Sequence, residues 1–191
     1  MYKLNGGWFM KKLLVVIDYQ NDFVNGALGF KKAEELEAGI YDKVKKYLSE
    51  GYNVVFTYDT HTNEYLNTRE GKNLPVSHCI SNTKGHELYG RLKEFKDDIN
   101  TIHINKYSFG ISPQQMLKLV ERIGEDIEYI EIVGVVTNIC VVSNVVTFQS
   151  QYINADILVD ASLCASFDED LHEKALDVIE SLQVKVKNRG I

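Results

Sequence analysis

Continuous apolar runs alternate along the chain with stretches of helical periodicity, and this alternation constrains the fold more than any other feature. Runs rich in Val, Ile and Leu predict strands at residues 13–18, 53–58, 101–105, 129–135, 156–160 and 184–187. Helical periodicity is found at residues 33–49, 113–123, 139–152 and 168–182. Because the strands lack polar alternation, both of their faces should be covered. The sequence therefore predicts an α/β fold: a doubly wound, mostly parallel six-stranded sheet with helices on both faces, in three α/β/α layers.

The size of the chain predicts a single domain. It has 191 residues, 45% of them hydrophobic, and only two prolines, which is enough to bury a sizeable core. Met10 is a natural start for the first strand. We therefore expect residues 10–191 to form the domain and residues 1–9 to be an N-terminal extension.

Charge and cysteine content restrict the partners and the compartment. The net charge is −6 with scattered lysines, which disfavours nucleic acid as a partner. Three cysteines without a CxxC pair favour a reducing compartment over a disulfide framework. The first apolar run ends at Asp18 and is too short for a signal peptide or a membrane span. We expect a cytoplasmic protein with no membrane partner.

Chemically capable side chains stand where four successive predicted strands end. These are Asp18, the Asp59-x-His61 pair, Lys106 and, after a sharp turn into a helix, Cys140. In a parallel α/β sheet, ligands bind beyond the carboxyl ends of the strands. This edge is therefore the predicted site.

Cys140 is the candidate nucleophile. It falls in the first turn of the predicted helix, where the helix dipole should favour the thiolate and lower the thiol pKa. Asp18 could accept the thiol proton and return it to a leaving amine, while Lys106 orients Asp18 and stabilises negative charge. The alternatives are a packed, inert cysteine and a purely structural Asp18–Lys106 ion pair.

A second group of residues suggests a metal site. Asp59 and His61 alternate on a strand and so share one face, and Glu70 and His78 follow in the next segment. Imidazole and carboxylate ligands suit a divalent metal; zinc is favoured, with iron and manganese as alternatives, and no organic cofactor is expected. The alternative is a polar loop whose histidines only form hydrogen bonds.

Three segments together resemble the isochorismatase-like cysteine hydrolases, of which the nicotinamidases are the best-known members. The segments are VIDYQNDF at residues 16–23, NKYSF at 105–109 and GVVTNICV at 134–141. The resemblance implies an isochorismatase-like hydrolase acting on non-peptide C–N bonds, with Asp18 as general base and acid, Lys106 as its partner and Cys140 as the nucleophile that forms a thioester. It also implies the metal ligands Asp59, His61 and His78, with Glu70 as an additional ligand.

The resemblance implies further details of the site and the assembly. The peptide bond between Val136 and Thr137 should be cis, and the backbone amides of Val136 and Cys140 should form the oxyanion hole. Phe23 should line the substrate pocket. Family members are commonly homo-oligomers, so the resemblance also implies a homo-oligomer here. Thr60 departs from the usual family pattern, in which a tryptophan is common at this position, and this leaves the substrate less certain than the reaction.

The leading interpretation is a cysteine amidohydrolase that acts on a small amide, with nicotinamide to nicotinate plus ammonia as the leading case. Three alternatives stay open at this stage. The substrate could be another small amide or a carbamoyl compound. The metal could activate water directly while Cys140 only packs. The chain could also bind a small ligand without turning it over.

Overall fold

The central sheet has six strands, all parallel, in the order β3-β2-β1-β4-β5-β6. The computed structural model describes residues 10–190, and the expected N-terminal extension, residues 1–9, lies outside them. The strands are β1 Lys12–Ile17, β2 Asn53–Asp59, β3 Thr101–Lys106, β4 Tyr129–Val135, β5 Asp156–Ala165 and β6 Lys185–Lys187. The strand order reverses between β1 and β4, which places the switch point of the sheet between these two strands.

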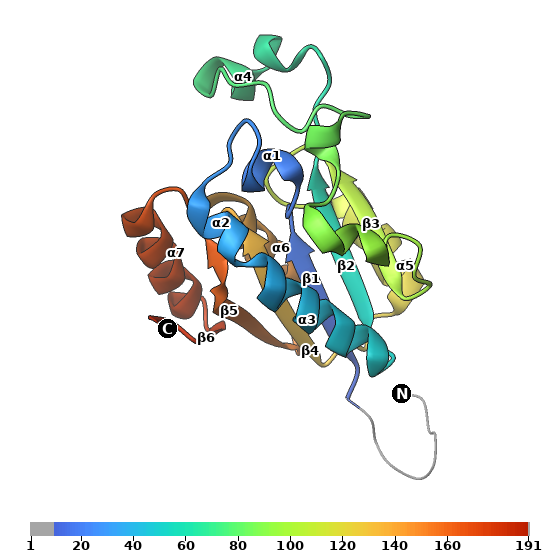
Figure 1. Ribbon diagram of the computed structural model, residues 1–191. Helices are drawn as coiled ribbons and strands as arrows, with labels where there is room; N and C mark the ends of the chain where they lie inside the picture. The colour runs from blue at the N-terminus through green and yellow to red at the C-terminus, as the bar shows by residue number, and fades with distance from the viewer. Residues whose placement is uncertain (1–9, 191) are drawn as a thin grey trace.

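Helices cover both faces of the sheet, as predicted (Figure 1). The α-helices are α1 Asn21–Val24, α2 Lys31–Glu35, α3 Glu37–Ser49, α4 Arg69–Asn73, α5 Pro113–Ile123, α6 Val142–Gln151 and α7 Glu169–Ser181. The tighter, 3₁₀-helical turns are η1 Tyr65–Asn67, η2 Lys84–His86 and η3 Gly90–Phe95, and the wider, π-helical turn is η4 Thr137–Val141. Figure 1 shows α3 in front of the sheet and α5 and α6 behind it.

Alternate residues of the buried strands pack into two separate cores. In β1, Leu14 and Val16 pack with the apolar side of α3, whereas Leu13, Val15 and Ile17 pack with α5, α6 and α7. All five side chains are fully buried. Because successive side chains of a strand point to opposite faces, an uninterrupted apolar run serves two cores at once. This confirms the three-layer α/β/α architecture.

Helix boundaries follow local capping chemistry. The Ser112 hydroxyl accepts a hydrogen bond from the Gln115 amide, and the Gln115 side chain accepts one in return from the Ser112 amide, so a capping box starts α5. Pro113 occupies the first turn, where no amide donor is needed. Asp168 caps α7 through the Leu171 amide at 3.0 Å.

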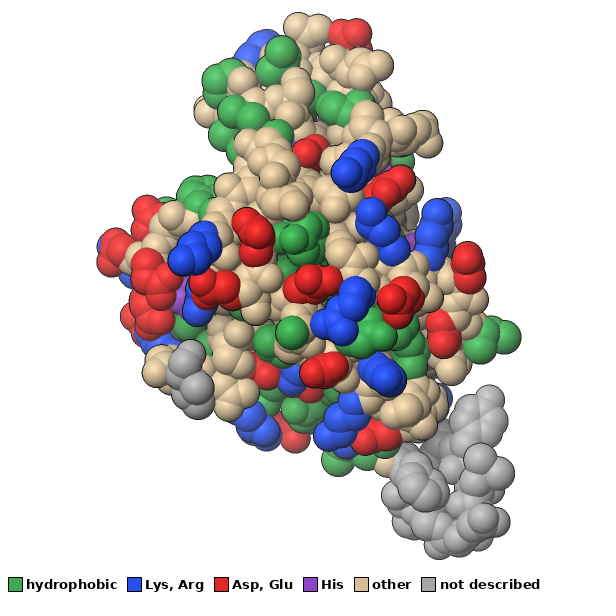
Figure 2. Space-filling view, in the orientation of Figure 1, with side chains coloured by type: hydrophobic (Ala, Val, Ile, Leu, Met, Phe, Trp, Pro, Cys, Tyr) green, Lys and Arg blue, Asp and Glu red, His purple; other side chains and the backbone are tan. Residues whose placement is uncertain are grey.

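The segment between β2 and η2 leaves the body of the domain. It carries η1 and α4 and projects beyond the carboxyl ends of the strands (Figure 1), and Figure 2 shows it as a lobe at the top of the molecule. Acidic and basic side chains are intermixed over the face seen in Figure 2. Within residues 10–190, no helix combines the length and apolar character needed to cross a lipid bilayer.

Candidate active site

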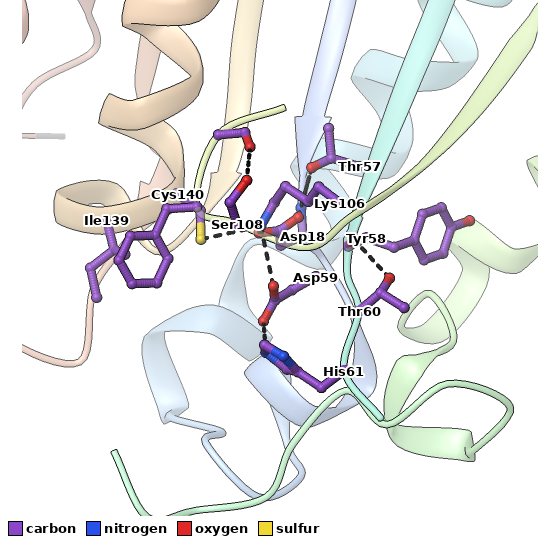
Figure 3. Close-up of polar contacts among 12 residues, drawn as sticks. Asp18, Thr57, Tyr58, Asp59, Thr60, His61, Lys106, Ser108, Ile139 and Cys140 are labelled. Atoms are coloured by element: carbon purple, nitrogen blue, oxygen red, sulfur yellow. Dashed lines mark hydrogen bonds and ion pairs between the residues drawn. The ribbon is translucent and has the colours of Figure 1, made fainter. Parts of the chain in front are cut away.

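The carboxyl ends of four neighbouring strands bring the predicted catalytic residues together. Asp18 directly follows β1, Asp59 ends β2, Lys106 ends β3, and Cys140 lies in the turn after β4. The close-up in Figure 3 shows the Lys106 side chain reaching toward Asp18, Asp59 and Cys140. The site lies where the strand order reverses, which is where open α/β sheets bind their ligands.

Asp18 has a partner at each of its carboxylate oxygens. Its Oδ1 accepts a hydrogen bond of 2.7 Å from the Thr57 hydroxyl, which also accepts a 3.2 Å bond from the Asp18 amide. Its Oδ2 forms an ion pair with Lys106 Nζ at 2.7 Å. Because each carboxylate oxygen has two lone pairs, Oδ2 can also accept a proton from a second donor.

Lys106 is the fully buried cation of the site. Its Nζ lies 2.7 Å from Asp18 Oδ2, 3.4 Å from Asp59 Oδ1 and 3.6 Å from the Cys140 sulfur. A buried ammonium is tolerated only when it is paired, and here two carboxylates and a sulfur surround it. The sequence-based grouping of Asp18, Lys106 and Cys140 thus corresponds to one contact cluster.

The electrostatics of this cluster keep Lys106 charged. Burial alone would lower the pKa of Lys106, but the charges of Asp18, Cys140 and Asp59 outweigh it and raise the pKa above its ordinary value. Burial raises the pKa of Asp18 although Lys106 opposes the shift, which makes Asp18 a stronger base than an exposed carboxylate.

Burial also raises the pKa of the Cys140 thiol, with Lys106 again opposing the shift. The sequence-based expectation of a lowered pKa is therefore wrong for the free protein. The thiol pKa is raised because the sulfur is deeply buried, and the carboxylates of Asp18 and Asp59 add to this effect. A thiol in this environment needs a nearby base before it can attack.

The turn that carries Cys140 differs from the predicted one in two respects. It is a wide π-helical turn, Thr137–Val141, that precedes α6, and not the first turn of an α-helix. The cis peptide bond joins Val135 to Val136, not Val136 to Thr137 as expected. The chain reverses one bond earlier because β4 ends at Val135 and Val136 already caps the turn, its carbonyl accepting bonds from the amides of Ile139 and Val141.

Gly134 makes the close approach of β1 and β4 possible at this point. Its φ is 114°, and a Cβ built there would lie 2.2 Å from the Ile17 carbonyl oxygen. No side chain could occupy that space without moving a strand. Glycine therefore allows the strand that leads to Asp18 and the strand that leads to Cys140 to lie next to each other.

The four predicted metal ligands also form one cluster. Asp59, His61, Glu70 and His78 each place a ligand atom within 4.8 Å of the others. His61 Nε2 and His78 Nε2 lie 2.9 and 3.3 Å from Asp59 Oδ2, and Glu70 Oε1 lies 3.8 Å from His61 Nε2. The Nδ1 of His78 is 2.8 Å from the Val76 carbonyl oxygen, so Nδ1 carries the proton and Nε2 is free to bind a metal. Two imidazoles and two carboxylates fit a divalent metal such as zinc.

Aromatic rings support the two imidazoles of this cluster. Tyr65 is fully buried, and its ring centre lies 4.5 Å from that of His61 and 4.9 Å from that of His78. Phe23, the predicted pocket residue, is also buried and makes an edge contact with His78 at 5.4 Å. Phe23 thus packs beside the metal ligands.

A cavity of about 270 Å³ opens next to the ligand cluster. It is lined by His61, Thr68, Arg69, Glu70, Tyr107, Ser108 and Phe109. Sequence reasoning did not assign Tyr107 and Phe109 to this lining, although both stand within three residues of Lys106. It also missed Thr57, Tyr65 and Asn144, whose contacts come from distant parts of the chain.

Comparisons with known proteins agree with this arrangement. A family model described as the isochorismatase domain matches residues 12–188. The chain is 32% identical to an uncharacterized isochorismatase family protein, PncA, of Bacillus subtilis, over 87% of this chain and 93% of that protein.

Two solved structures show how far the likeness extends. The nicotinamidase/pyrazinamidase PncA of Bacillus subtilis superposes with a TM-score of 0.81 at 32% identity, covering 93% of this chain and 99% of that one. The pyrazinamidase of Pyrococcus horikoshii, solved in complex with zinc, has a TM-score of 0.78 at 22% identity and covers 92% and 98% of the two chains. The second likeness is one of fold.

Proposed function

The chain belongs to the isochorismatase family as a nicotinamidase-like amidohydrolase, and we propose that it hydrolyses a small amide through a thioester on Cys140. Nicotinamide is the leading substrate, giving nicotinate and ammonia. The single observation that carries the proposal is the buried contact group of Asp18, Lys106 and Cys140, with Lys106 Nζ 2.7 Å from Asp18 and 3.6 Å from the sulfur.

The first half of the reaction forms the thioester. The Cys140 thiol passes its proton to Asp18 Oδ2, and the sulfur attacks the amide carbon, so that a C–S bond forms and the carbonyl oxygen becomes negative. We place the backbone amides of Val136 and Cys140 around that oxygen. Asp18 returns the proton to the amide nitrogen, the C–N bond breaks, and ammonia leaves.

The second half releases the acid. Asp18 accepts a proton from a water molecule, whose oxygen attacks the thioester carbon, and the proton returns to the sulfur as the C–S bond breaks. Lys106 stays charged throughout, since its pKa is raised. It holds Asp18 in place and stabilises negative charge on the sulfur.

Asp59, His61, Glu70 and His78 would hold the metal. A bound zinc ion would supply a Lewis acid for a ring nitrogen or a carbonyl oxygen of the substrate, which would orient it. The cavity beside these ligands, walled by Tyr107 and Phe109, is of a size that suits a small planar amide.

Replacement of the nucleophile tests the proposal. Cys140→Ala should lower ammonia release from nicotinamide at least about a thousandfold, because no thioester can form. The matched control is Cys164→Ala, a buried cysteine on β5 outside the contact group, which should keep most of the activity. Wild-type protein quenched during turnover should carry an acyl mass adduct on the peptide that contains Cys140.

The alternatives give different results in the same assay. Substantial ammonia release by Cys140→Ala, lost on chelation, would show that metal-bound water is the nucleophile and would refute the thioester. Pyrazinamide and simple aliphatic and carbamoyl amides, assayed beside nicotinamide, identify the substrate class. No turnover of any amide, with ligand binding retained, would indicate a binding protein.

A further inference from the structure

Asn144 connects the nucleophile turn to a distant loop. Its side chain is fully buried on α6. The Nδ2 group donates to the Cys140 carbonyl at 2.8 Å and to the Phe109 carbonyl at 3.1 Å, and Oδ1 accepts from the Ile111 amide at 3.1 Å. All three bonds go to main-chain atoms, and two of them reach a segment more than thirty residues away.

The loop that Asn144 holds is one wall of the candidate substrate cavity. Residues 107–111 follow Lys106 directly, and Tyr107, Ser108 and Phe109 line the cavity beside the metal-ligand cluster. Tyr107 and Phe109 are 71% and 40% exposed, so their own packing does not immobilise them. Their positions depend on how the backbone of the loop is held.

The same loop is seated closely on α6. A Cβ built on Gly110 would lie 3.0 Å from the Thr147 hydroxyl oxygen and 3.2 Å from the Ser143 carbonyl oxygen. The Ile111 side chain is buried in the core that contains α6. Glycine at position 110 and the amide of Asn144 thus act together to fix the distance between the loop and the helix.

We propose that Asn144 is a positioning residue that sets the width of the substrate pocket, by tying the wall of residues 107–111 to the turn that carries Cys140. The amide group suits this task because it can donate two bonds and accept one at the same time. Where the substrate is concerned, this inference rests on the proposed amide hydrolysis.

The helix itself suggests a variant that separates the bond of Asn144 to the turn from its two bonds to the loop. In α6, the hydroxyls of Ser143, Thr147 and Ser150 each donate to the carbonyl four residues earlier, at 2.6, 2.9 and 2.7 Å. The hydroxyl introduced by Asn144→Ser can therefore keep the bond to the Cys140 carbonyl, but it is too short to reach the loop. The matched control is Ser143→Ala, which removes a bond from α6 to the Ile139 carbonyl in the turn that carries Cys140 and leaves the loop contacts intact.

Alkylation of Cys140 measures how freely a reagent passes this loop to reach the nucleophile, without any substrate. The two reagents are iodoacetamide and a bulky N-aryl maleimide, and the modified peptide is identified by mass. The ratio of the two rate constants cancels most changes in thiol ionisation, because both reagents need the same thiolate. We expect Asn144→Ser to reduce the preference for the small reagent about tenfold, the effect of losing two buried hydrogen bonds, and Ser143→Ala to leave it unchanged.

Gly110→Ala provides an independent variant of the same wall. Its added methyl group would lie 3.0 Å from the Thr147 hydroxyl oxygen and 3.2 Å from the Ser143 carbonyl oxygen, so it should displace the loop slightly from α6 and shift the alkylation ratio in the same direction as Asn144→Ser. In Asn144→Ser, hydrogen exchange of the Ile111 amide should become faster together with the shift in the alkylation ratio. For the amide substrate, KM of Asn144→Ser should rise about tenfold while kcat changes less than about twofold.

Two outcomes would overturn the inference. One is faster exchange of the Ile111 amide with an unchanged alkylation ratio, since the loop would then be loose without altering the pocket. The other is an equal change of the ratio in Ser143→Ala, which would mean that any weakening of this turn has the same effect. If the wild type turned over no amide, the proposed function would fail, whereas the alkylation ratio would still decide the role of Asn144.

Discussion

Asp59 belongs to two groups of side chains at once. Its Oδ1 faces Lys106 at 3.4 Å, and its Oδ2 faces the imidazoles of His61 and His78. Burial would raise the pKa of Asp59, but hydrogen bonds from the two histidines and the charge of Lys106 outweigh it and hold the pKa well below its ordinary value. A single ionised carboxylate therefore links the candidate metal site to the candidate nucleophile.

The base in this site should titrate above the range of an ordinary aspartate. Asp18 accepts a proton only when it is ionised, and burial raises its pKa above the ordinary value of 3.8. As the pH falls through this raised pKa, kcat/KM for the amide should fall with it. Asp18→Asn should lower kcat about 10²- to 10⁴-fold, because the side chain keeps its shape and loses its basicity.

The measurement is a pH profile of kcat/KM for the wild type and Asp18→Asn. The matched control is Asp22→Asn. This aspartate accepts a hydrogen bond from the Cys79 amide and lies outside the group of Asp18, Lys106 and Cys140. The control should keep the fall of kcat/KM at low pH. A wild-type fall whose midpoint lies at or below the ordinary aspartate pKa, or a fall that persists in Asp18→Asn, would contradict the assignment.

At the scale of elements, a second charged network joins α3 to the sheet. Lys43 on α3 pairs with Glu131 on β4, and its Nζ lies 2.8 Å from Asp160 on β5. The Tyr47 hydroxyl donates to Glu131 at 2.7 Å, and the Asn188 amide donates to Asp160 at 2.9 Å. Each charge has partners, so the network ties a helix to two central strands on the face opposite to α6 and α7.

Removing the cation of this network should destabilise the fold. Lys43→Met leaves Glu131 and Asp160 close together and uncompensated, and we expect a loss of about 3 kcal/mol in the free energy of unfolding. The matched control, Lys45→Met, changes an exposed lysine on the same helix and should stay within about 0.5 kcal/mol of the wild type. Urea denaturation followed by circular dichroism measures both.

The loss of stability in Lys43→Met should depend on pH, and the direction of this dependence can be predicted. Burial would raise the pKa of Asp160, but hydrogen bonds from Lys43, Asn188 and Ser162 outweigh it and lower the pKa. A lowered pKa adds stability that is present above the ordinary value and is lost as the pH falls through the lowered one. The difference between the wild type and Lys43→Met should therefore shrink in acid. A constant difference would show that packing, and not charge, explains the loss.

At the scale of the whole molecule, the site lies between the body of the domain and its projecting lobe. The body supplies Asp18, Lys106, Cys140 and Asp59 from the ends of parallel strands. The lobe is the segment between β2 and η2 (Figure 1), and it contains His61 near its start, Glu70 on α4 and His78 nearer its end. A metal bound by these residues would connect both ends of the lobe to β2.

Zinc should therefore stabilise the whole molecule. At a free concentration one hundred times its Kd, a ligand that binds only the folded state adds about 2.7 kcal/mol, which corresponds to roughly 5 to 10 °C in Tm for a chain of this length. His78→Asn should lose most of this shift. The matched control is His103→Asn, which changes an imidazole on the edge strand β3 and should keep it.

Protons should compete with zinc for the same imidazoles. Burial would lower the pKa of His78, but its hydrogen bond with Asp59 outweighs it and raises the pKa above the ordinary 6.5. The Tm shift caused by zinc should thus diminish as the pH falls through this raised value, because only the neutral imidazole binds a metal. Differential scanning calorimetry with and without zinc measures it, and an equal shift in His78→Asn would contradict the ligand set.

Much of the fold and part of the candidate site could be predicted from local sequence signals. The uninterrupted apolar run before Asp18 indicates a strand covered on both faces, and repeated runs of this kind indicate a parallel sheet. Parallel strands place their carboxyl ends at one edge, so the polar residues that end the runs had to meet there. Asp18, Asp59, Lys106 and Cys140 were predicted in this way, and they lie together.

Other features depend on contacts that only the tertiary structure determines. The family resemblance implied a cis bond after Val136, whereas the backbone of the turn after β4 has it one bond earlier, between Val135 and Val136. The raised pKa of Cys140 depends on how deeply neighbouring elements bury the sulfur. Asn144 looks like any polar residue on a helix until the loop after Lys106 folds against it. Periodicity records which side of an element is buried, whereas the partner of a buried polar atom depends on chain segments far away in the sequence.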